Sequence, residues 1–539
     1  MSFIKSLLKR ENKSSFKSAR DDGRDPSMAM AKSGWLLDLD GSQLDLVTVL
    51  TYLSCISTAN VTREQLFDAA ARLGYMPSPY FAQVANLVQS LGYDFAHACH
   101  AVSETCADET VKQFLLRMGN SMASGEPEPV FLTREMHVQM EDYTNSYERD
   151  IETLRKWTDA FVALMVSCNL IVLVSLISNM IYDLGAMFII IVEVISIVAA
   201  AMGAWLIYRM APFDPLIHKL PDRCAEQRLM SRLAMVLFPL AVIVGLLLAI
   251  ALGNIGLGML VGGLLVLPVG VVTLALERKV DARDRDIADF LRALGGVTSA
   301  RSSTVIESLS HIDRRAIGSL EMELRRLLTR VHAGLSTVKC WYKFMAETGS
   351  ELIHRSVRCF WDANDLGGDS DKIGRFSADM ALRVSLLRAK RRLVASTFNY
   401  VVMPMHVALI GTLIFISEVV SAFNTQLLKA QASAEGEATT LNPEDIGIPG
   451  ALSFQSFNTG FMHLMVLIVV IALTIVNGFA PRAAAGGHGY KLAFFGGLTL
   501  ILSGAILLIV PPVARGMFSD TLTQGAATAA SANPEGNAQ

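Results

Sequence analysis

The residues of this chain that could do chemistry do not form any familiar catalytic arrangement. Its 539 residues contain no G-x-x-x-x-G-K-[ST] sequence, which a P-loop needs to hold phosphates. No H-E-x-x-H occurs, and the ten histidines lack the spacing of zinc ligands. We therefore expect no enzyme activity, no catalytic or cofactor-binding residues, and no metal or cofactor.

The cysteines do not indicate a redox or disulfide site either. They are scattered, and none forms the C-x-x-C pair of a zinc ribbon or a thioredoxin-like motif. They are Cys55, Cys99, Cys106, Cys168, Cys224, Cys340 and Cys359. Charge and hydrophobicity therefore carry more information about this chain than its reactive groups do.

The composition indicates an integral membrane protein. Hydrophobic residues make up 52% of the chain and charged residues only 18%, with a mean hydropathy of +0.40. A soluble protein carries about 25% charged residues, so the deficit points to lipid-facing surface. The net charge of −3 argues against a nucleic-acid binder that relies on phosphate contacts.

Seven apolar stretches are long enough to cross a bilayer, which takes about 20 helical residues. Because the bilayer core has no water to pair with backbone polar groups, each stretch is expected to be a helix. The predicted spans are 160–182, 186–208, 233–252, 255–276, 398–419, 457–480 and 492–513. Their interior charges reduce to Glu193, with Glu418 at one edge.

Lys and Arg near the span ends predict the orientation, because cytoplasmic connections are enriched in them. The connections 209–232 and 277–397 are basic, whereas 253–254 has no Lys or Arg and 424–456 is mainly acidic. This alternation predicts a multi-pass protein of the cell membrane with a cytoplasmic N-terminus and an external C-terminus. Residues 1–24 lack the apolar segment of a secretory signal. We expect them to be a disordered, solvated tail, and the alternative interpretation is a short basic amphipathic helix on anionic lipid.

Two soluble blocks between the spans show apolar residues at helical spacing. In the second block, one predicted face consists of Leu320, Leu324, Leu327, Leu328 and Val331. We predict an all-α polytopic membrane protein with about seven transmembrane helices and two homologous cytoplasmic helical bundles. The predicted division is a basic, disordered tail (1–37), a first helical domain (38–158), four membrane helices with a basic cytoplasmic loop at 209–232 (159–276), a second helical domain (277–397), three membrane helices with an external loop at 424–456 (398–513) and a disordered external tail (514–539).

The two soluble blocks resemble one another, which predicts an internal repeat. The spacing of Leu46, Val49, Leu50 and Leu53 recurs in Ile287, Phe290, Leu291 and Leu294. Small-residue turns follow without a gap, as Ile56-Ser57-Thr58-Ala59 and Val297-Thr298-Ser299-Ala300. Later, Ser124-Gly125-Glu126 parallels Gly367-Gly368-Asp369, and a helical pattern that runs into a predicted span follows each.

A helical domain with this order of features resembles the type II secretion system protein F family. Two copies in one chain look like the archaeal platform proteins of archaella and type IV-like pili, whereas bacterial tight-adherence systems split similar domains over two shorter proteins. The resemblance covers most of residues 40–515. Where the family commonly has Gly after the first helix, this chain has Asn60 and Arg301. Because Arg adopts a left-handed conformation reluctantly, the second turn is expected to differ from the family's.

The resemblance implies a non-enzymatic platform that binds a separate cytoplasmic assembly ATPase and transmits its motion to the insertion of pilin- or archaellin-like filament subunits. It also implies a homodimer in the lipid bilayer, while the net charge argues against nucleic acid as a partner. The alternative is a secondary membrane transporter, a class with repeated membrane bundles and polar residues at the midplane. In this chain the repeat lies in the soluble blocks and not in the membrane helices, which argues against a transporter. A membrane receptor would explain neither the duplication nor the small outer face.

Basic residues of the second block are the predicted contacts for the ATPase or another partner. They are Arg314, Arg315, Arg325, Arg326, Arg330, Arg388, Lys390, Arg391 and Arg392. A basic run beside a bilayer also sets topology and attracts anionic lipid, which is the alternative interpretation of 388–392. For 314–330 the alternative is a solvated helix face.

Glu193 and a glycine pair are the candidate contacts inside the membrane. A charged side chain at the bilayer centre costs about 2.5–3.5 kcal/mol, so Glu193 should face the bundle or a wet cavity. It could pair with Asn169 or Ser175, meet the transmembrane helix of an incoming subunit, or be protonated and merely buried. Gly258 and Gly262 permit close helix packing within the protein or across a dimer, unless they reflect the ordinary glycine content of membrane helices.

Overall fold

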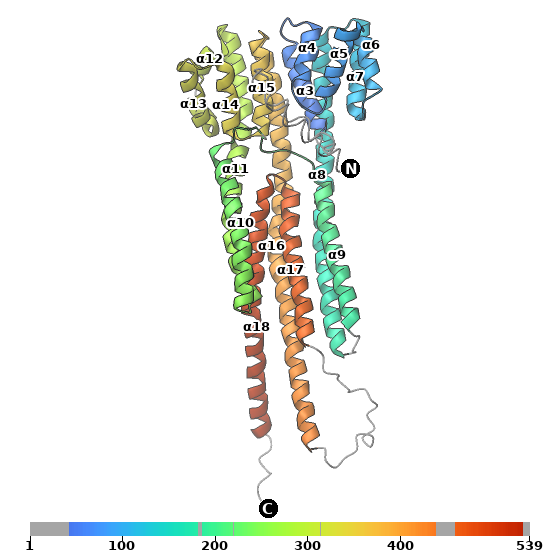
Figure 1. Cartoon of the computed structure of the whole chain (residues 1–539), viewed down its shortest axis with the longest axis vertical. Helices are drawn as coiled ribbons and strands as arrows, with labels where there is room; N and C mark the ends of the chain where they lie inside the picture. Colours follow the sequence, from blue (N-terminus) through green and yellow to red (C-terminus); the bar gives the residue numbers. More distant parts are fainter. Residues whose placement is uncertain (1–41, 182–185, 219, 313, 438–458, 532–539) are drawn as a thin grey trace, which may run out of the picture. The chain divides into compact units, whose positions relative to one another are not determined.

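The computed structural model describes residues 42–181, 186–218, 220–312, 314–437 and 459–531 (Figure 1). This part of the chain is helical almost throughout, with one isolated bridge between Ile217 and Ser350 and no strand. The predicted all-helical class is thereby confirmed. The predicted N-terminal tail and the greater part of the predicted external loop lie outside the described residues.

The helices fall into two runs that each end in membrane-type segments. The first run is α3 (Ser42–Ile56), α4 (Arg63–Ala71), α5 (Ser78–Leu91), α6 (Phe95–Ser103), α7 (Glu109–Ser124), α8 (Glu128–Ile181), α9 (Ala186–Met210) and α10 (Ala225–Ala251). The second run is α11 (Ile255–Arg301), α12 (Val305–His311), η2 (Arg314–Leu320), α13 (Glu321–His332), α14 (Thr337–Thr348), α15 (Glu351–Asp365), α16 (Ser370–Glu437), α17 (Thr459–Ala485), η4 (Gly489–Lys491) and α18 (Leu492–Ser531).

Seven helices in the described part are long and apolar enough to cross a membrane, as predicted. They are α8, α9, α10, α11, α16, α17 and α18. Helices α8, α11 and α16 have 54, 47 and 68 residues, far more than the roughly 20 that a bilayer needs, because each joins a polar segment to an apolar one without a break. The chain is a multi-pass membrane protein.

Two helices extend further than the sequence patterns indicated. Helix α16 continues to Glu437 and α18 to Ser531, so residues 424–437 and 514–531 are helical where a loop and a disordered tail were expected. Both extensions are rich in alanine, the strongest helix former. The prediction gave too little weight to that propensity.

The chain divides into two compact units. The first, here called the polar unit, comprises Met1–Ile151, Pro212–Arg228 and Ala275–Lys390. The second, the membrane unit, comprises Glu152–Ala211, Leu229–Leu274 and Arg391–Gln539. Both predicted soluble blocks thus contribute to a single polar unit.

Aromatic contacts form the core of the first helical block. The Phe81 ring lies 5.8 Å from Phe67 and 6.1 Å from Phe114, which joins α4, α5 and α7. Helix α4 begins at a capping box, in which the Thr62 side chain accepts from the Gln65 backbone N–H and the Gln65 side chain accepts from the Thr62 N–H. Local capping therefore fixes the start of α4, and aromatic packing holds α4, α5 and α7 together.

Helix α3 packs on α15 through a buried polar contact. The Arg355 side chain is 7% exposed, and its Nη1 donates to Asp45 Oδ1 at 2.7 Å and to Thr48 Oγ1 at 3.1 Å. Its Nε donates to Glu351 Oε1 at 2.9 Å, and the guanidinium lies 4.5 Å from the centre of the Tyr75 ring. Because a buried charge is tolerated only when it is paired, these contacts fix the register of α3 against α15.

The two turns matched by the predicted repeat share a backbone conformation. Gly125 ends α7 with φ of 74° and Gly367 follows α15 with φ of 80°, a left-handed geometry that glycine adopts at low cost. A long helix follows each turn, α8 in the first block and α16 in the second. The eight matched apolar residues are all buried, in α3 and in the last third of α11. These local features support the internal repeat, which we retain as a proposal.

Candidate functional site

Arg325 and Arg326 lie on the exposed face of α13, while the leucines of the predicted apolar face are buried. Neither arginine has an ion pair within the described residues. Arg330, one turn further along α13, is partly exposed and pairs with Glu347 of α14. Of the predicted contacts on this helix, two therefore offer free charge to a partner and the third is already neutralised.

Arg388 is buried inside the polar unit. Its side chain is 5% exposed and binds two carboxylates, Asp214 through Nε and Nη2 and Asp284 through Nη1, each at 2.7 Å. Nη2 also donates to the Pro215 carbonyl at 3.0 Å. This guanidinium ties α16 to α11 and to the segment after α9, so it is a structural group and we remove it from the proposed contact surface.

The remaining basic candidates are distributed between surface and interior. Lys390 is exposed and paired with a glutamate of α8. Arg391 is 6% exposed, within the membrane unit, and its Nε donates at 3.2 Å to a carbonyl near the end of α17. Arg392 is half-buried. The side chains of Arg314 and Arg315 lie outside those that the structure describes, so their predicted role is untouched.

Two histidines lie near the junction of α14 and α15. His218 Nε2 lies 2.9 Å from the Ala346 carbonyl, and His218 Nδ1 accepts from the Leu220 N–H at 3.2 Å, so the ring is held neutral with its proton on Nε2. Burial lowers the pKa of His218. On α15, burial lowers the pKa of His354 from 6.5 to about 4, against the opposing effect of the Glu351 carboxylate.

His354 should make the polar unit sensitive to acid. Between pH 6.5 and 4 the unfolded chain binds a proton at this ring that the folded chain excludes, so stability falls as the pH is lowered through that window. Between pH 7 and pH 5 the full linkage value is about 2 kcal/mol, and because the side chain is 14% exposed we expect a loss of about 1–2 kcal/mol. Thermal unfolding of the detergent-solubilised chain at pH 7 and pH 5 measures it. The loss of stability between pH 7 and pH 5 should be smaller for His354→Gln than for wild type. For His97→Gln, at an exposed position, the loss should equal that of wild type.

Glu193 is 3% exposed on α9, which places it in the bundle as expected. Its Oε1 has no hydrogen-bond partner, and neither does Asn169 Oδ1 or Ser175 Oγ on α8. The predicted pairing of Glu193 with one of these residues is therefore absent. Buried polar atoms without partners are rare in folded proteins, and each calls for an explanation.

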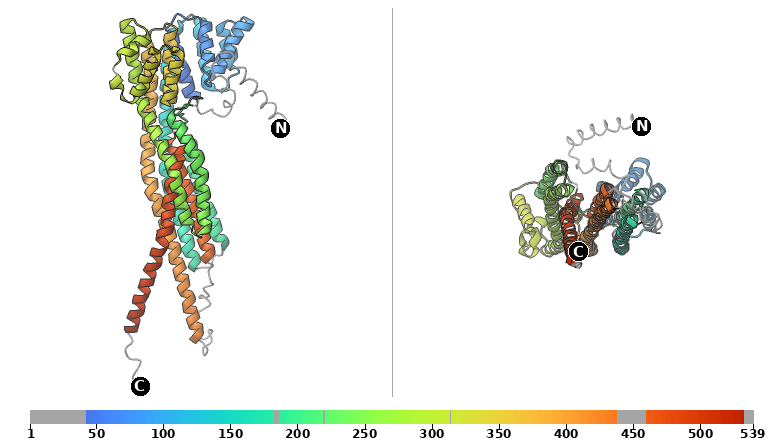
Figure 2. Two further views of the ribbon diagram at one scale, coloured as in Figure 1. Left: turned by 60° about the vertical axis from the view of Figure 1, so that its left-hand side comes forward. Right: turned by 90° about the horizontal axis from the view of Figure 1, so that it is seen from below.

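Gly258 packs closely against α10 within the membrane unit. A Cβ on Gly258 would stand 2.5 Å from the Gly245 carbonyl oxygen and 3.1 Å from the Ala249 Cβ. A Cβ on Gly262 would stand 3.5 Å from the Ala241 carbonyl oxygen, an ordinary contact. Both views of Figure 2 show α10 and α11, in green, side by side. The predicted packing face is thus satisfied inside one chain.

The glycine pair yields a contrast between two identical substitutions. Gly258→Ala should destabilise the membrane unit by about 1–3 kcal/mol, because the new methyl group meets backbone that cannot yield. Gly262→Ala should be close to neutral. Thermal stability of both variants in the same detergent tests this contrast, and equal losses would show that the pair acts as a unit.

A buried polar cluster that the sequence search missed connects α16, α17 and α18. His406 is fully buried, and its Nδ1 lies 3.0 Å from Asn477 Nδ2 while its Nε2 lies 3.0 Å from Ser503 Oγ. Ser503 Oγ in turn lies 2.7 Å from Thr474 Oγ1. Interior charge was the criterion for a candidate within the spans, and His406, Asn477, Ser503 and Thr474 carry no formal charge. A signal was present, since His, Asn, Ser and Thr in apolar helices commonly bond across helices.

These features define a multi-pass helical membrane protein whose polar unit is built from both soluble blocks. Among the described residues, no group of three or more His, Cys, Asp or Glu side chains is arranged to hold a metal ion. Among the candidate side chains that the structure describes, Arg325 and Arg326 on α13 are exposed without an ion pair, and Glu193 on α9 is buried with no hydrogen bond at Oε1.

Comparison with known proteins identifies relatives. Flagella accessory protein J of Methanocaldococcus jannaschii is 26% identical over 304 residues, 52% of each chain. Flagella accessory protein J of Methanococcus voltae is 22% identical over 447 residues, 79% of this chain and 76% of the relative. The first alignment thus spans about half the length of the relative. No family model and no solved structure matches the chain. The chain is therefore similar to Flagella accessory protein J, which confirms the predicted resemblance to archaeal platform proteins.

Proposed function

We propose that this chain is a non-enzymatic platform protein, the membrane assembly core of an archaellum or a type IV pilus-like filament machine. In this role it binds a separate cytoplasmic assembly ATPase and transmits its motion to the insertion of pilin- or archaellin-like subunits. The relation to Flagella accessory protein J along 79% of the chain is the observation that carries the proposal. The proposed orientation, with a cytoplasmic N-terminus and an external C-terminus, rests on the basic connections between spans.

Unbroken helices support the proposed transmission of motion. Helices α8, α11 and α16 each contain residues of both the polar unit and the membrane unit. Displacement of the polar end of such a helix by an ATPase would be passed along the helix to its apolar end. Pro268 in α11 and Pro404 in α16 are the positions where these two helices bend most easily, because proline removes a backbone hydrogen bond. The exposed arginines of α13 are the proposed contact for that ATPase.

Gentle detergent extraction from native membranes, followed by mass spectrometry of the proteins that co-purify, tests the proposal. We expect a secretion-type ATPase or filament subunits to be enriched over an unrelated multi-pass protein purified in the same way. If the chain is recovered alone, the platform function is wrong. No observation in the structure favours the transporter alternative, and the comparisons do not support it.

A further inference from the structure

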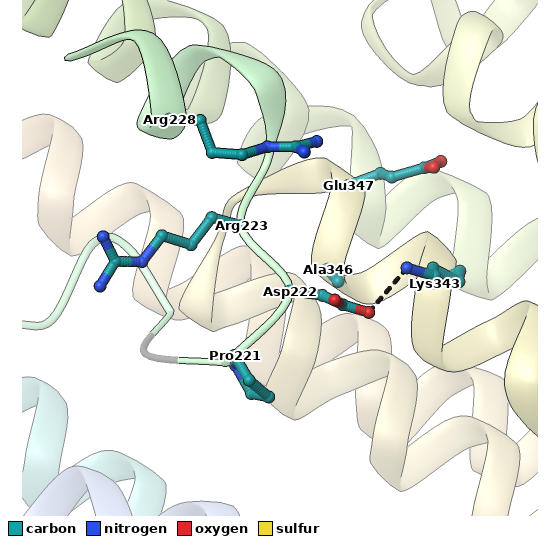
Figure 3. Close-up of a pocket in the computed structure, with 7 residues that line it drawn as sticks. All are labelled: Pro221, Asp222, Arg223, Arg228, Lys343, Ala346 and Glu347. Atoms are coloured by element: carbon teal, nitrogen blue, oxygen red, sulfur yellow. Dashed lines mark hydrogen bonds and ion pairs between the residues drawn. The ribbon is translucent and has the colours of Figure 1, made fainter. Parts of the chain in front are cut away.

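A groove on the polar unit borders Arg325 and Arg326. It has a volume of about 670 Å³ and lies between the start of α10, the polar end of α11 and the N-terminal half of α13. A smaller cavity of about 230 Å³ adjoins it and shares Arg223, Arg228 and Glu347 (Figure 3). Figure 3 shows Arg228 extending toward Glu347 across this smaller cavity, and Lys343 paired with Asp222 at 2.7 Å.

The charges in the groove do not cancel. Lys279 pairs with Glu226 at 3.1 Å, and Arg283 pairs with Glu323 at 2.6 Å, so these four side chains are neutral in sum. The two exposed arginines of α13 are not ion-paired within the part of the chain that the structure describes. The α13 side also carries Glu321, whereas Glu347 is already paired with Arg330. The lining as a whole has six basic and four acidic side chains, so the groove keeps a positive balance that attracts carboxylates.

The same side of the groove offers an apolar contact. Met322 is 61% exposed and lies one turn before Arg325 and Arg326 on α13. On the floor, Arg283 Nε and Glu323 Oε2 are buried without hydrogen-bond partners. Met322 thus lies beside two cations, and its Sδ accepts from Arg326 Nη2 at 3.3 Å. Buried polar atoms without partners call for an explanation, and a bound partner that covers the groove would supply one.

We propose that this groove binds an acidic segment of a cytoplasmic protein partner, with its carboxylates on Arg325 and Arg326 and an apolar side chain on Met322. This assignment rests on the proposed function, and it specifies the kind of segment by which the assembly ATPase would dock. The groove also includes Glu226 and Arg228 in the first turn of α10, so the occupant would touch the residues that lead directly into the third apolar helix.

A photo-crosslinking residue at position 322 of the full-length chain tests the occupant in native membranes. Illumination should join position 322 to a peptide rich in Asp and Glu that belongs to the co-purifying ATPase. Position 91, on α5 of the same unit, is 66% exposed and away from the groove, and it should give no such product. The yield should fall at 1 M salt, where the Debye length is about 3 Å.

Charge reversal decides whether the contact is electrostatic. R325E combined with R326E should lower the crosslinking yield at least tenfold at normal protein levels. R72E combined with R285E, at exposed positions of the polar unit outside the groove, should not. Lys in place of the acidic residues of the captured peptide should restore the yield with the doubly reversed chain.

The possible failures are distinguishable. Lipid adducts at position 322, a captured peptide without acidic residues, or a yield that charge reversal leaves unchanged would each overturn the groove assignment. If the ATPase co-purifies but position 322 captures nothing, the groove assignment is wrong and the proposed function stands. If neither the ATPase nor filament subunits co-purify, the proposed function itself is wrong.

Discussion

Replacement of Arg388 by methionine should lower the free energy of unfolding of the polar unit by about 3–5 kcal/mol. The guanidinium is enclosed by Asp214 and Asp284, and all three side chains are at most 7% exposed. Its removal leaves two buried carboxylates without a counter-charge. That penalty exceeds the packing gained from methionine, because an unpaired buried charge costs far more than a lost contact.

Thermal or denaturant unfolding of the detergent-solubilised chain measures this effect. Arg383→Met is the matched control on the same helix, since Arg383 pairs with Asp379 at 3.0 Å but is 39% exposed, and it should change stability by at most about 1 kcal/mol. Adding Asn at both positions 214 and 284 to the Arg388 variant should recover most of the loss. A single Arg388 variant as stable as the control would show that these carboxylates are not held by Arg388.

Local patterns predicted the parts of the fold that depend on local sequence. Apolar runs of about 20 residues identified seven spans, because lipid demands such runs whatever they pack against. The leucine face of α13 could likewise be read from spacing alone, since burial on a helix repeats every three to four residues. The exposure of Arg325 and Arg326 follows from the same periodicity.

Partners distant in sequence could not be predicted in this way. Arg388 looked like one member of a basic run beside the bilayer, and its carboxylates lie 174 and 104 residues away along the chain. His406 bonds to groups 71 and 97 residues away. No periodicity records such pairs, so a basic cluster separates into surface and core only when the helices are placed.

The turn after α11 shows the same limit at the level of one residue. The expectation concerned Arg301, which would resist a left-handed conformation. Instead α11 continues through Arg301, and Ser302 takes the positive φ of 50° as the one non-glycine residue of the described chain to do so. Residues 297–300, which were expected to form a turn matching residues 56–59, are helical, so that part of the prediction was wrong. The longer helix includes Arg301 and removes the steric conflict, which a comparison of residue types alone could not reveal.

Replacement of Glu193 by leucine should stabilise the membrane unit by about 2.5–3.5 kcal/mol. The side chain is buried in a helix of strongly apolar composition, and its Oε1 has no hydrogen-bond partner. A glutamate in this position weakens the bundle whether it is ionised or neutral. Leucine fills a similar volume and removes the unpaired group. Heating the detergent-purified chain and following the loss of its monodisperse form measures the gain, with Ser196→Ala on the same buried face of α9 as the control.

The function of the carboxyl group follows from a second measurement on the same variants. If Glu193 meets an incoming subunit, Glu193→Leu should prevent filament assembly in cells that contain normal amounts of the chain, despite its greater stability. Glu193→Gln keeps the shape and hydrogen-bonding capacity of the side chain. Filament assembly with Gln but not with Leu would indicate that a hydrogen bond is needed. Loss of assembly with both variants would indicate that the negative charge is needed. A leucine variant less stable than wild type would contradict the argument, because it would mean that Glu193 already has a partner that stabilises it. A stabilised variant that cannot assemble filaments would show that a costly residue is retained for assembly, a common compromise between stability and activity.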